Sequence, residues 1–383
     1  MDFSYSDEQR MLKDMVDRLV ADQYTFEARE SIRTSEAGFS AEVWQQFAEL
    51  GLLGVPFSEA AGGFDGGGAE LMVVSEGFGR GLVLEPYLST VVLCGSLIDR
   101  LADETRRAEL AEGIIGGETR YALASHEPDG GYDPHWVRTT ARAEGDGFVL
   151  DGHKAVVAHG DSADRLIVIA RSSGEIDSAE GLSAFIVEAD AAGVHRRGYE
   201  TIDGHRAAEV TLEAVHVDAD ALLGEVGGAG DALESALERG VVALCAEAAG
   251  AMEIACDLTL DYLKERKQFG VPIGSFQALQ HRMVDMRMAL EKVRSLTFWA
   301  ACSLESDPAE RRQRIAAAKV MVGKAGRLVA EEAIQLFGGM GMMEESAIAH
   351  YAKRIVMIDH YLGDRTWHMA ALRETLTDTA RAA

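Results

Sequence analysis

The sequence predicts an α+β protein made of three consecutive segments, the first helical, the second β and the third helical. Apolar residues recur with a helical period up to about residue 115 and again from about Asp231, and between them lie short β-branched runs bounded by turns. The 383 residues are enough for two or three full-sized cores. We therefore expect an N-terminal helical domain at 1–118, a middle β domain at 119–225 and a C-terminal helical domain at 226–383.

The first segment carries several helix signals. Ser6 and Gln9 have the Ser-x-x-Gln spacing of a capping box ahead of an apolar stripe. Ser40 begins a second helix, which Gly51 ends. Between the helices, the glycine-rich stretch 60–68 is expected to be a flexible loop. Further helices fit Glu70–Gly81, Glu85–Leu101 and Thr105–Gly113.

The middle segment alternates β-branched runs with turn residues. Examples are GFVLDGHKAVV, RLIVIARS and LSAFIVEA, and Asp146-Gly147 between two such runs is typical of a hairpin. No helical run separates these strands. We therefore expect an antiparallel sandwich or barrel.

The last segment consists of long helical runs. They cover Asp231–Lys267, Phe276–Glu305, Pro308–Phe337 and Glu345 to about Thr379. Four helices of this length predict an antiparallel four-helix bundle.

Composition excludes several classes of function. The net charge of −26 argues against nucleic acids and anionic membranes as partners. The four cysteines are far apart and form no Cys-x-x-Cys pair, so we expect buried thiols and no metal site. The N-terminus lacks the apolar region of a signal peptide, and no apolar stretch reaches membrane-spanning length without charge. These features predict a cytoplasmic protein.

One motif, RKQFGVPIGSFQ at 266–277, interrupts two long helical runs. Arg266 and Lys267 lie where a helix C-terminus favours cations, and Gly270 and Pro272 end the helix. Two aromatics and an amide, Phe269, Phe276 and Gln277, share the break. This combination suits a planar, phosphorylated ligand. The alternative is an interhelical loop with a snorkelling arginine.

A second motif, Gln335-Leu-Phe-Gly-Gly-Met-Gly341, follows the third long helical run. Gly338 and Gly339 lack Cβ and allow a ligand to approach the backbone closely, although a glycine C-cap is the alternative. No strand precedes the motif, so it is not a Rossmann fingerprint.

Together these motifs resemble the flavin-linked acyl-CoA dehydrogenases. The resemblance implies the three-part fold, FAD as cofactor, an acyl-CoA substrate, α,β-dehydrogenation and an electron-transfer flavoprotein as acceptor. Oxygen as acceptor is a weaker option. In the family these positions contact the ADP half of FAD held largely by the neighbouring subunit. The residues implied are Arg266, Gln268, Phe269, Ile273, Phe276, Gln277, Gln335, Gly338 and Gly339.

The flavin-ring motifs match the family only in part. Ser125-His126-Glu127-Pro128 and the residues up to Asp133 correspond to the family's Thr-Glu-Pro…Gly-Ser-Asp, and GHKAVVAHG at 152–160 corresponds to Gly-x-Lys-x-Trp-Ile-Thr-Asn. The resemblance therefore implies ring contacts at Leu123, Ser125, His126, Val156 and Ala158, and a substrate contact at Tyr132. The alternative for His126 is a structural hydrogen bond at a strand end.

The catalytic base is the largest departure from the family. A glutamate in a Tyr-Glu-Gly-Thr segment usually removes the α-proton, but here Leu362 occupies its position and Asp364 replaces the threonine near the cofactor. Some members carry the base in a Glu-Arg pair on the first bundle helix, which makes Glu238 the candidate base and Arg239 a substrate contact. Glu238 lies two residues further upstream than in those members, a rotation of about 200° on a helix. The alternative is a helix-start glutamate stabilised by the dipole.

Two hypotheses follow. In the first, the chain is a complete dehydrogenase with Glu238 as base. In the second, it is the catalytically incomplete small subunit of an α2β2 enzyme, similar to the pimeloyl-CoA type and to those acting on steroid side chains. Both imply an oligomer, because the Arg266 and Gly338 motifs have no role within one subunit.

Overall fold

The computed structural model describes residues 5–382 of the chain, with side chains up to residue 376. The chain divides into two compact units. Of the described residues, 5–31, 67–83 and 241–382 form the helical unit, and 32–66 and 84–240 form the mixed unit. None of the described helices is both long enough and apolar enough to cross a membrane.

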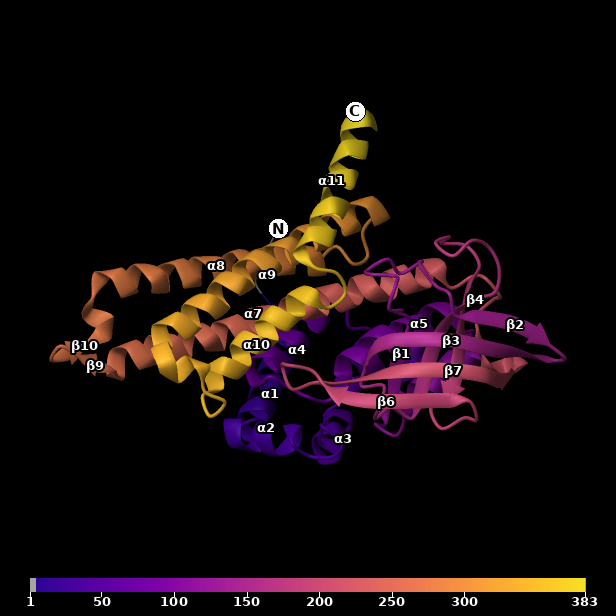
Figure 1. Cartoon of the computed structure of the whole chain (residues 1–383), viewed down its shortest axis with the longest axis horizontal. Coiled ribbons are helices and arrows are strands. Elements are labelled where there is room, and N and C mark those ends of the chain that lie inside the picture. The colour runs from indigo at the N-terminus through magenta and orange to yellow at the C-terminus, as the bar shows by residue number, and fades with distance from the viewer. Residues whose placement is uncertain (1–4, 383) are drawn as a thin grey trace. The chain divides into compact units, whose positions relative to one another are not determined.

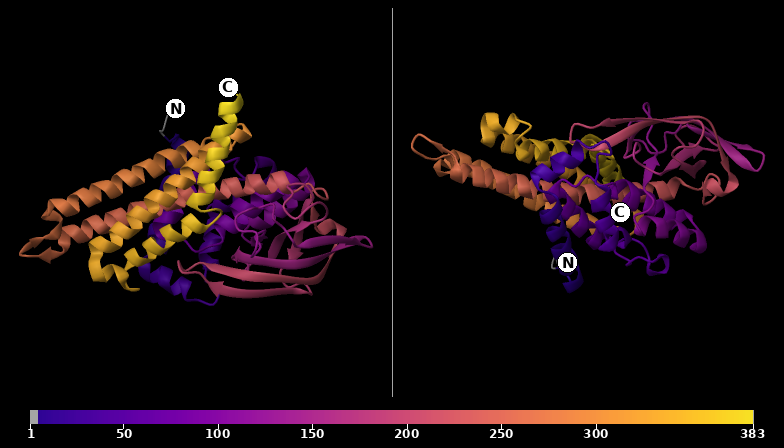
Figure 2. Two further views of the ribbon diagram at one scale, coloured as in Figure 1. Left: turned by 45° about the horizontal axis from the view of Figure 1, so that its top comes forward. Right: turned by 90° about the horizontal axis from the view of Figure 1, so that it is seen from below.

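The helical unit is built around helix α9 (Pro308–Phe337), which packs against α8 (Gln277–Ala301), α10 (Ala347–His360) and α11 (Arg365–Ala382). Helices α8, α9 and α10 run alongside one another in every view (Figures 1 and 2). The unit also contains α1 (Asp7–Gln23), α4 (Gly68–Gly81) and most of α7 (Gly230–Glu265). Helix α2 (Phe26–Arg33) spans the boundary between the units.

Two glycines allow α4 and α7 to cross with their backbones in contact. A Cβ atom on Gly79 would overlap the carbonyl oxygen of Glu247, and one on Gly250 would overlap the carbonyl oxygen of Glu76. The side chains around this crossing form ion pairs, with Arg80 Nε donating to Glu253 at 2.7 Å. The crossing therefore depends on the absence of two methyl groups.

The mixed unit holds the sheet. Its helices are α3 (Ala41–Glu49), α5 (Gly95–Leu101) and α6 (Glu104–Ile115), and a π-helical stretch, η3 (Leu88–Cys94), leads into α5. Eight strands form one sheet in the order β6-β7-β3-β2-β4-β5-β8, with β1 paired to β4. The strands are β1 (Tyr121–Ala124), β2 (Thr140–Glu144), β3 (Gly147–Ala158), β4 (Arg165–Arg171), β5 (Leu182–Glu188), β6 (Val194–Glu200), β7 (Arg206–Asp218) and β8 (Leu222–Leu223).

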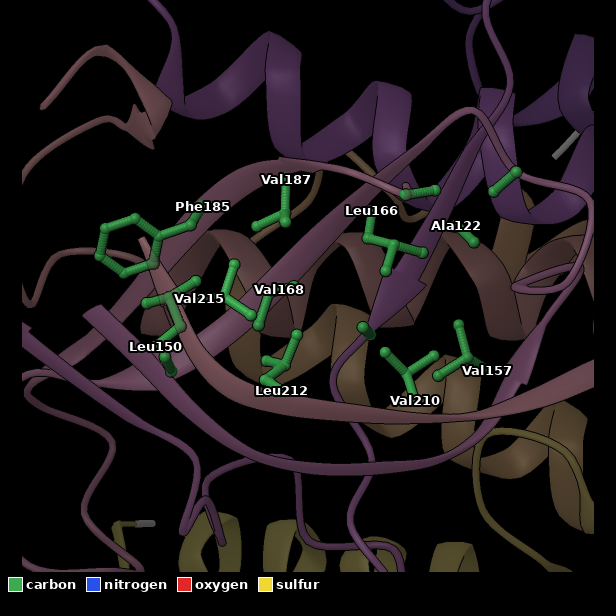
Figure 3. Close-up of a cluster of buried hydrophobic side chains, with 14 of the residues drawn as sticks. Ala122, Leu150, Val157, Leu166, Val168, Phe185, Val187, Val210, Leu212 and Val215 are labelled. Atoms are coloured by element: carbon green, nitrogen blue, oxygen red, sulfur yellow. The ribbon is translucent and has the colours of Figure 1, made fainter. Parts of the chain in front are cut away.

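Apolar side chains from most of these strands form the core of the sheet domain. Leu150, Leu166, Phe185 and Val210 are fully buried within it and come from four different strands (Figure 3). Strand β4 contributes the alternate residues Leu166, Val168 and Ala170 to this cluster, as the two-residue period of a strand requires.

The predicted fold class is confirmed, and four local predictions were wrong. The last helical run is two helices, because the turn Tyr361–Asp364 separates α10 from α11. Strand β1 pairs with β4 in parallel, although the other extended pairings are antiparallel. The hairpin turn is Gly145-Asp146, one residue earlier than predicted, because Gly145 supplies the positive φ of 59°.

The fourth correction concerns the glycine-rich stretch 60–68, which is packed. The Gly66 amide donates to the Val55 carbonyl at 2.7 Å, and a Cβ atom on Gly63 would overlap the Phe57 carbonyl oxygen. The glycines here permit close backbone contact. Helix α2 was also missed, since only Arg29 among its residues is buried and no apolar stripe marks it.

The glycine crossing generates a stability prediction. Gly79→Ala and Gly250→Ala should each lower the free energy of unfolding by about 1–3 kcal/mol, because overpacking outweighs the gain in helix propensity. Urea denaturation measures the change. Gly67→Ala is the matched control, since its nearest atom would be Glu70 Oε2 at 3.5 Å. A stabilised Gly250→Ala protein would contradict the described crossing.

Candidate functional site

The 266–277 motif forms a short hairpin between α7 and α8. Strands β9 (Lys267–Gln268) and β10 (Val271–Pro272) pair antiparallel around Phe269 and Gly270. Both turn residues have positive φ, 54° and 81°, as a type I′ turn requires. Phe269 is 92% exposed and packs edge-to-face on Phe276 at a centroid distance of 6.3 Å. A large aromatic side chain in the left-handed conformation at an exposed tip is unusual.

The polar groups of this hairpin face solvent. Arg266, Lys267, Gln268 and Gln277 are exposed, and Ile273 is half-buried. Among the residues that the structure describes, neither Arg266 nor Lys267 has an ion-pair partner. Two cations beside two exposed aromatics are therefore available to a phosphorylated ligand.

The Gly338 motif lies at the same end of the helical unit. The Tyr262 ring near the end of α7 stacks on the Phe337 ring at the end of α9, with centroids 4.4 Å apart. Gly338 has φ 61° and ψ −142°, a conformation essentially restricted to glycine. Gly338 and Gly339 are exposed, and a Cβ atom added to either would have no other atom within 4 Å. Gln335 is exposed beside them. The two motifs therefore lie at the same end of the unit. The Gly338 motif offers exposed backbone, and the 266–277 motif offers two cations.

Sequence reasoning missed a row of methionines beside Gly338. Met340, Met342 and Met343 are 53%, 76% and 46% exposed. Exposed thioethers in a row are suited to an adaptable apolar contact. The run of methionines in the sequence was the available signal.

In the mixed unit, a buried ion pair anchors the loop that follows β1. Lys154 on β3 is fully buried, and its Nζ donates to Glu127 Oε1 at 2.7 Å and to the Ser125 carbonyl at 3.2 Å. Glu127 also accepts from the Thr139 amide at 2.9 Å and from its hydroxyl at 2.7 Å. Both ends of the 125–139 loop are therefore tied to one carboxylate.

The pKa values of this pair reflect burial and mutual attraction. Burial lowers the pKa of Lys154 to about 8, against the raising effect of Glu127. Burial alone would raise the pKa of Glu127, but Lys154 and the hydrogen bonds from Lys154 and Thr139 outweigh it, and the pKa lies below its usual value. Glu127 is therefore an acceptor-only carboxylate at neutral pH.

The predicted flavin-ring residues meet where β3 bulges. The register of β3 and β7 shifts between Lys154 and Val157, and there the Ala155 amide donates to the His126 carbonyl at 2.9 Å. Val156 is 52% exposed and has φ 51°. A β-branched residue in this conformation is strained by about 1–2 kcal/mol.

The remaining predicted ring positions differ in exposure. Ser125 and Leu123 are buried, and Ala158 is half-buried. Burial lowers the pKa of His126, and Lys154 lowers it further, so its imidazole is neutral at pH 7. Tyr132 is half-buried in the same loop.

Arg239 and Glu238 differ in their surroundings. Arg239 lines a small cavity of about 40 Å³ together with Val91, Ser96 and Asp99. Glu238 is half-buried on α7 and does not line this cavity. Side chains of consecutive helix residues point in different directions, so only one of these two reaches the cavity.

The Tyr361–Asp364 turn presents no unengaged carboxylate. Leu362 is half-buried with φ 56°. Asp364 accepts a hydrogen bond from the Trp367 amide at 2.8 Å and caps the start of α11. Asp364 is thereby used as a structural cap.

Comparison with known proteins gives one consistent result. Family models for the acyl-CoA dehydrogenase N-terminal, middle and C-terminal domains match residues 6–118, 122–215 and 227–376. The probable acyl-CoA dehydrogenase YngJ of Bacillus subtilis is 30% identical over 353 residues, 91% of this chain and 92% of that protein. This chain belongs to the acyl-CoA dehydrogenase family.

Solved structures of this family superimpose over nearly the whole chain. The Tcur3481-Tcur3483 steroid ACAD variant is 30% identical with a TM-score of 0.87, covering 98% of this chain and 99% of that one. The ChsE4-ChsE5 complex of Mycobacterium tuberculosis is 25% identical with a TM-score of 0.89 and the same coverage. Butyryl-CoA dehydrogenase of Megasphaera elsdenii is 26% identical with a TM-score of 0.90, covering 98% and 100%.

These comparisons confirm the family, the fold class and the assignment of the chain as an oxidoreductase. The predicted cofactor, FAD, agrees with the family. An FAD complex of PigA has the same fold, with a TM-score of 0.90 and 23% identity. The individual site residues remain predictions.

The buried pair generates a prediction of its own. Lys154→Met should lower the free energy of unfolding by about 3–5 kcal/mol, because it leaves the Glu127 carboxylate buried without its cation. The Lys154→Met/Glu127→Leu double variant is the control and should recover part of the loss. Denaturant unfolding measures both, and a single variant as stable as wild type would contradict the ion pair.

The same pair has a pH signature. A folded-state pKa below the unfolded value of 4.5 means that Glu127 contributes stability above that value and loses it as the pH falls through the lowered pKa. Wild type should therefore lose stability relative to the double variant as the pH falls below 4.5.

Proposed function

We propose that this chain is the FAD-binding subunit of an enzyme that carries out α,β-dehydrogenation of an acyl-CoA thioester. The observation that carries the proposal is the convergence of exposed cations, exposed aromatics and open glycine backbone at one end of the helical unit. Family membership supports the chemistry, and butyryl-CoA dehydrogenase among the solved relatives supports a thioester substrate.

The residues of the helical unit fit the diphosphate and adenosine half of FAD. Arg266 and Lys267 are cations without ion-pair partners among the described residues, and Gly338 and Gly339 leave room for a ligand against the backbone. Phe269 and Phe276 offer aromatic faces and edges to a purine. Because these groups project into solvent, we propose that they bind cofactor held by a neighbouring subunit.

The mixed unit fits the flavin ring less completely. Val156 and Ala158 offer neither a hydroxyl nor an aromatic ring, and the contacts left are backbone groups, Ser125 and the neutral His126. Bound FAD would supply hydride acceptance from the substrate Cβ. The chain's own part is to hold the ring against a strained, rigid bulge that the Lys154–Glu127 pair supports.

The position of the base favours the partner-subunit version of this function. Leu362 has no group to accept a proton, and Asp364 is used as a helix cap. Glu238 has a carboxylate, but it lies two residues upstream of the position at which other members carry the base, a rotation of about 200° on a helix. The similar structure of the ChsE4-ChsE5 complex contains two differently named proteins, which supports a hetero-oligomer, such as an α2β2 assembly, for this chain. The alternative is a homo-oligomer that is complete by itself, with Glu238 as base and Arg239 on the substrate.

Three further assignments belong to the proposal. The electron acceptor is an electron-transfer flavoprotein, the location is the cytoplasm, and the domain boundaries are 1–118, 119–225 and 226–383. None of them alters the assignment of the reaction.

The visible spectrum of the purified chain, taken with its mass in solution, tests the proposal. We expect flavin absorbance near 450 nm only when the subunit encoded beside it is co-expressed. Arg266→Ala should reduce FAD content of that complex at least tenfold, since a charged contact to phosphate is lost. A colourless complex with an undisturbed fold would refute FAD binding, and a yellow, active homo-oligomer would refute the partner-subunit version.

A pair of substitutions separates the two versions of the base. Glu238→Gln should leave turnover of the co-expressed complex within twofold of wild type, because proton transfer belongs to the other chain. In a self-sufficient enzyme the same change would abolish turnover while FAD stays bound. Leu362→Glu, which puts a carboxylate at the usual base position, is the complementary variant and should raise turnover only where this turn faces substrate.

A further inference from the structure

Lys319 on α9 is fully buried, and its ammonium group lies within a ring of backbone carbonyls. Its Nζ donates to the carbonyl oxygens of Ile358 at 2.8 Å, Asp359 at 3.0 Å, Tyr361 at 2.7 Å and Gly363 at 2.7 Å. The first two belong to the last turn of α10, where carbonyls lack intrahelical partners. The other two belong to the turn that follows. One ammonium ion therefore closes α10 and shapes the turn.

Two side chains from α11 and the turn fix the same backbone. His368 Nε2 donates to the Leu362 carbonyl at 2.9 Å, and Asp364 accepts from the Trp367 amide at 2.8 Å. Burial lowers the pKa of His368 to about 4, so the imidazole is neutral and holds its Nε2 proton for this bond. The carbonyls of residues 361–363 are thus all engaged, which leaves the turn one conformation.

The turn holds a leucine in a conformation that leucine avoids. Leu362 has φ 56° and Gly363 has φ 97°. A left-handed non-glycine residue is less stable by about 1–2 kcal/mol and persists only where its surroundings over-determine it. Lys319 and His368 supply that constraint.

We propose that Lys319 is a positioning residue for the cofactor site. It holds the Tyr361–Asp364 turn so that the Leu362 side chain occupies one fixed place. The inference rests on the proposed function in one respect, that this turn borders the flavin. The turn therefore keeps one backbone conformation although leucine stands where the family has a proton-transfer group. The Leu362 side chain then makes an apolar contact with the flavin or the acyl chain.

A purely structural role for Lys319 makes a different prediction. As a C-cap for α10 alone, Lys319 would affect the free energy of unfolding and leave the flavin unchanged at temperatures where the protein is folded. A positioning role changes the affinity or the reduction potential of the flavin in a protein that remains folded. The two roles are separated by measuring the flavin together with the stability.

The experiment compares Lys319→Met with Lys324→Met in the preparation in which wild type carries FAD. Lys324 is exposed on the same helix and is the matched control. Amide hydrogen exchange reports the turn, and FAD fluorescence titration and the flavin midpoint potential report the site. Lys319→Met should speed exchange at 361–365 at least tenfold and weaken FAD binding at least tenfold, and Lys319→Arg should restore part of both. Lys324→Met should change neither.

Two outcomes would overturn the inference: unchanged exchange in the turn, or faster exchange with unchanged FAD affinity and potential. If Lys319→Met does not fold, His368→Leu, which removes the donor to Leu362, takes its place with the same criteria. A wild type that binds no FAD in any preparation would instead refute the proposed function. The exchange comparison would then decide whether Lys319 shapes the turn.

Discussion

A buried ammonium ion must be surrounded by oxygen atoms, and this requirement shapes both predicted site loops. Lys154 meets it with the Glu127 carboxylate and the Ser125 carbonyl, and Lys319 meets it with four carbonyls. Burial lowers the pKa of each lysine to about 8, so each remains charged at neutral pH. The backbone of each loop is held by its lysine, and the exposed residues can vary without changing the loop.

This arrangement explains how the site can drift in composition. At 156, 158 and 362, the predicted flavin-ring and base positions, the chain has valine, alanine and leucine, and the bulge and the turn are nevertheless well defined. The buried residues Lys154 and Lys319 hold the shapes of the bulge and the turn, whereas their chemistry would come from the exposed and half-buried side chains. A substitution that removes the chemistry therefore need not change the shape.

Much of the fold follows from the sequence because its signals are local. The cap at Ser6 and the bounds of Pro308–Phe337 agree with the structure, since a capping box, a helix-starting proline and a closing glycine act within one turn. The parallel pairing of β1 with β4 and the break at Tyr361–Asp364 depend on distant partners. Lys319 sits within an apolar run, and its carbonyl partners lie about forty residues away.

The candidate site was predictable where it consists of exposed motifs. Arg266, Phe269 and Gly338 stand out by residue type, and the structure adds that they share one end of a bundle. The backbone conformation of the predicted site residues could not be predicted. The positive φ values of Val156 and Leu362 are invisible in sequence, because neither residue type is usual in that region.

The exposed tip at Phe269 has a consequence for handling the protein. With Met342 at the same end, it places strongly apolar atoms on a chain of net charge −26. At low ionic strength mutual repulsion keeps such chains apart, but salt screens that repulsion within about 10 Å at 0.1 M. The subunit produced alone should therefore bind to hydrophobic-interaction resins and self-associate as salt is added, and co-expression with whatever covers this end should suppress both.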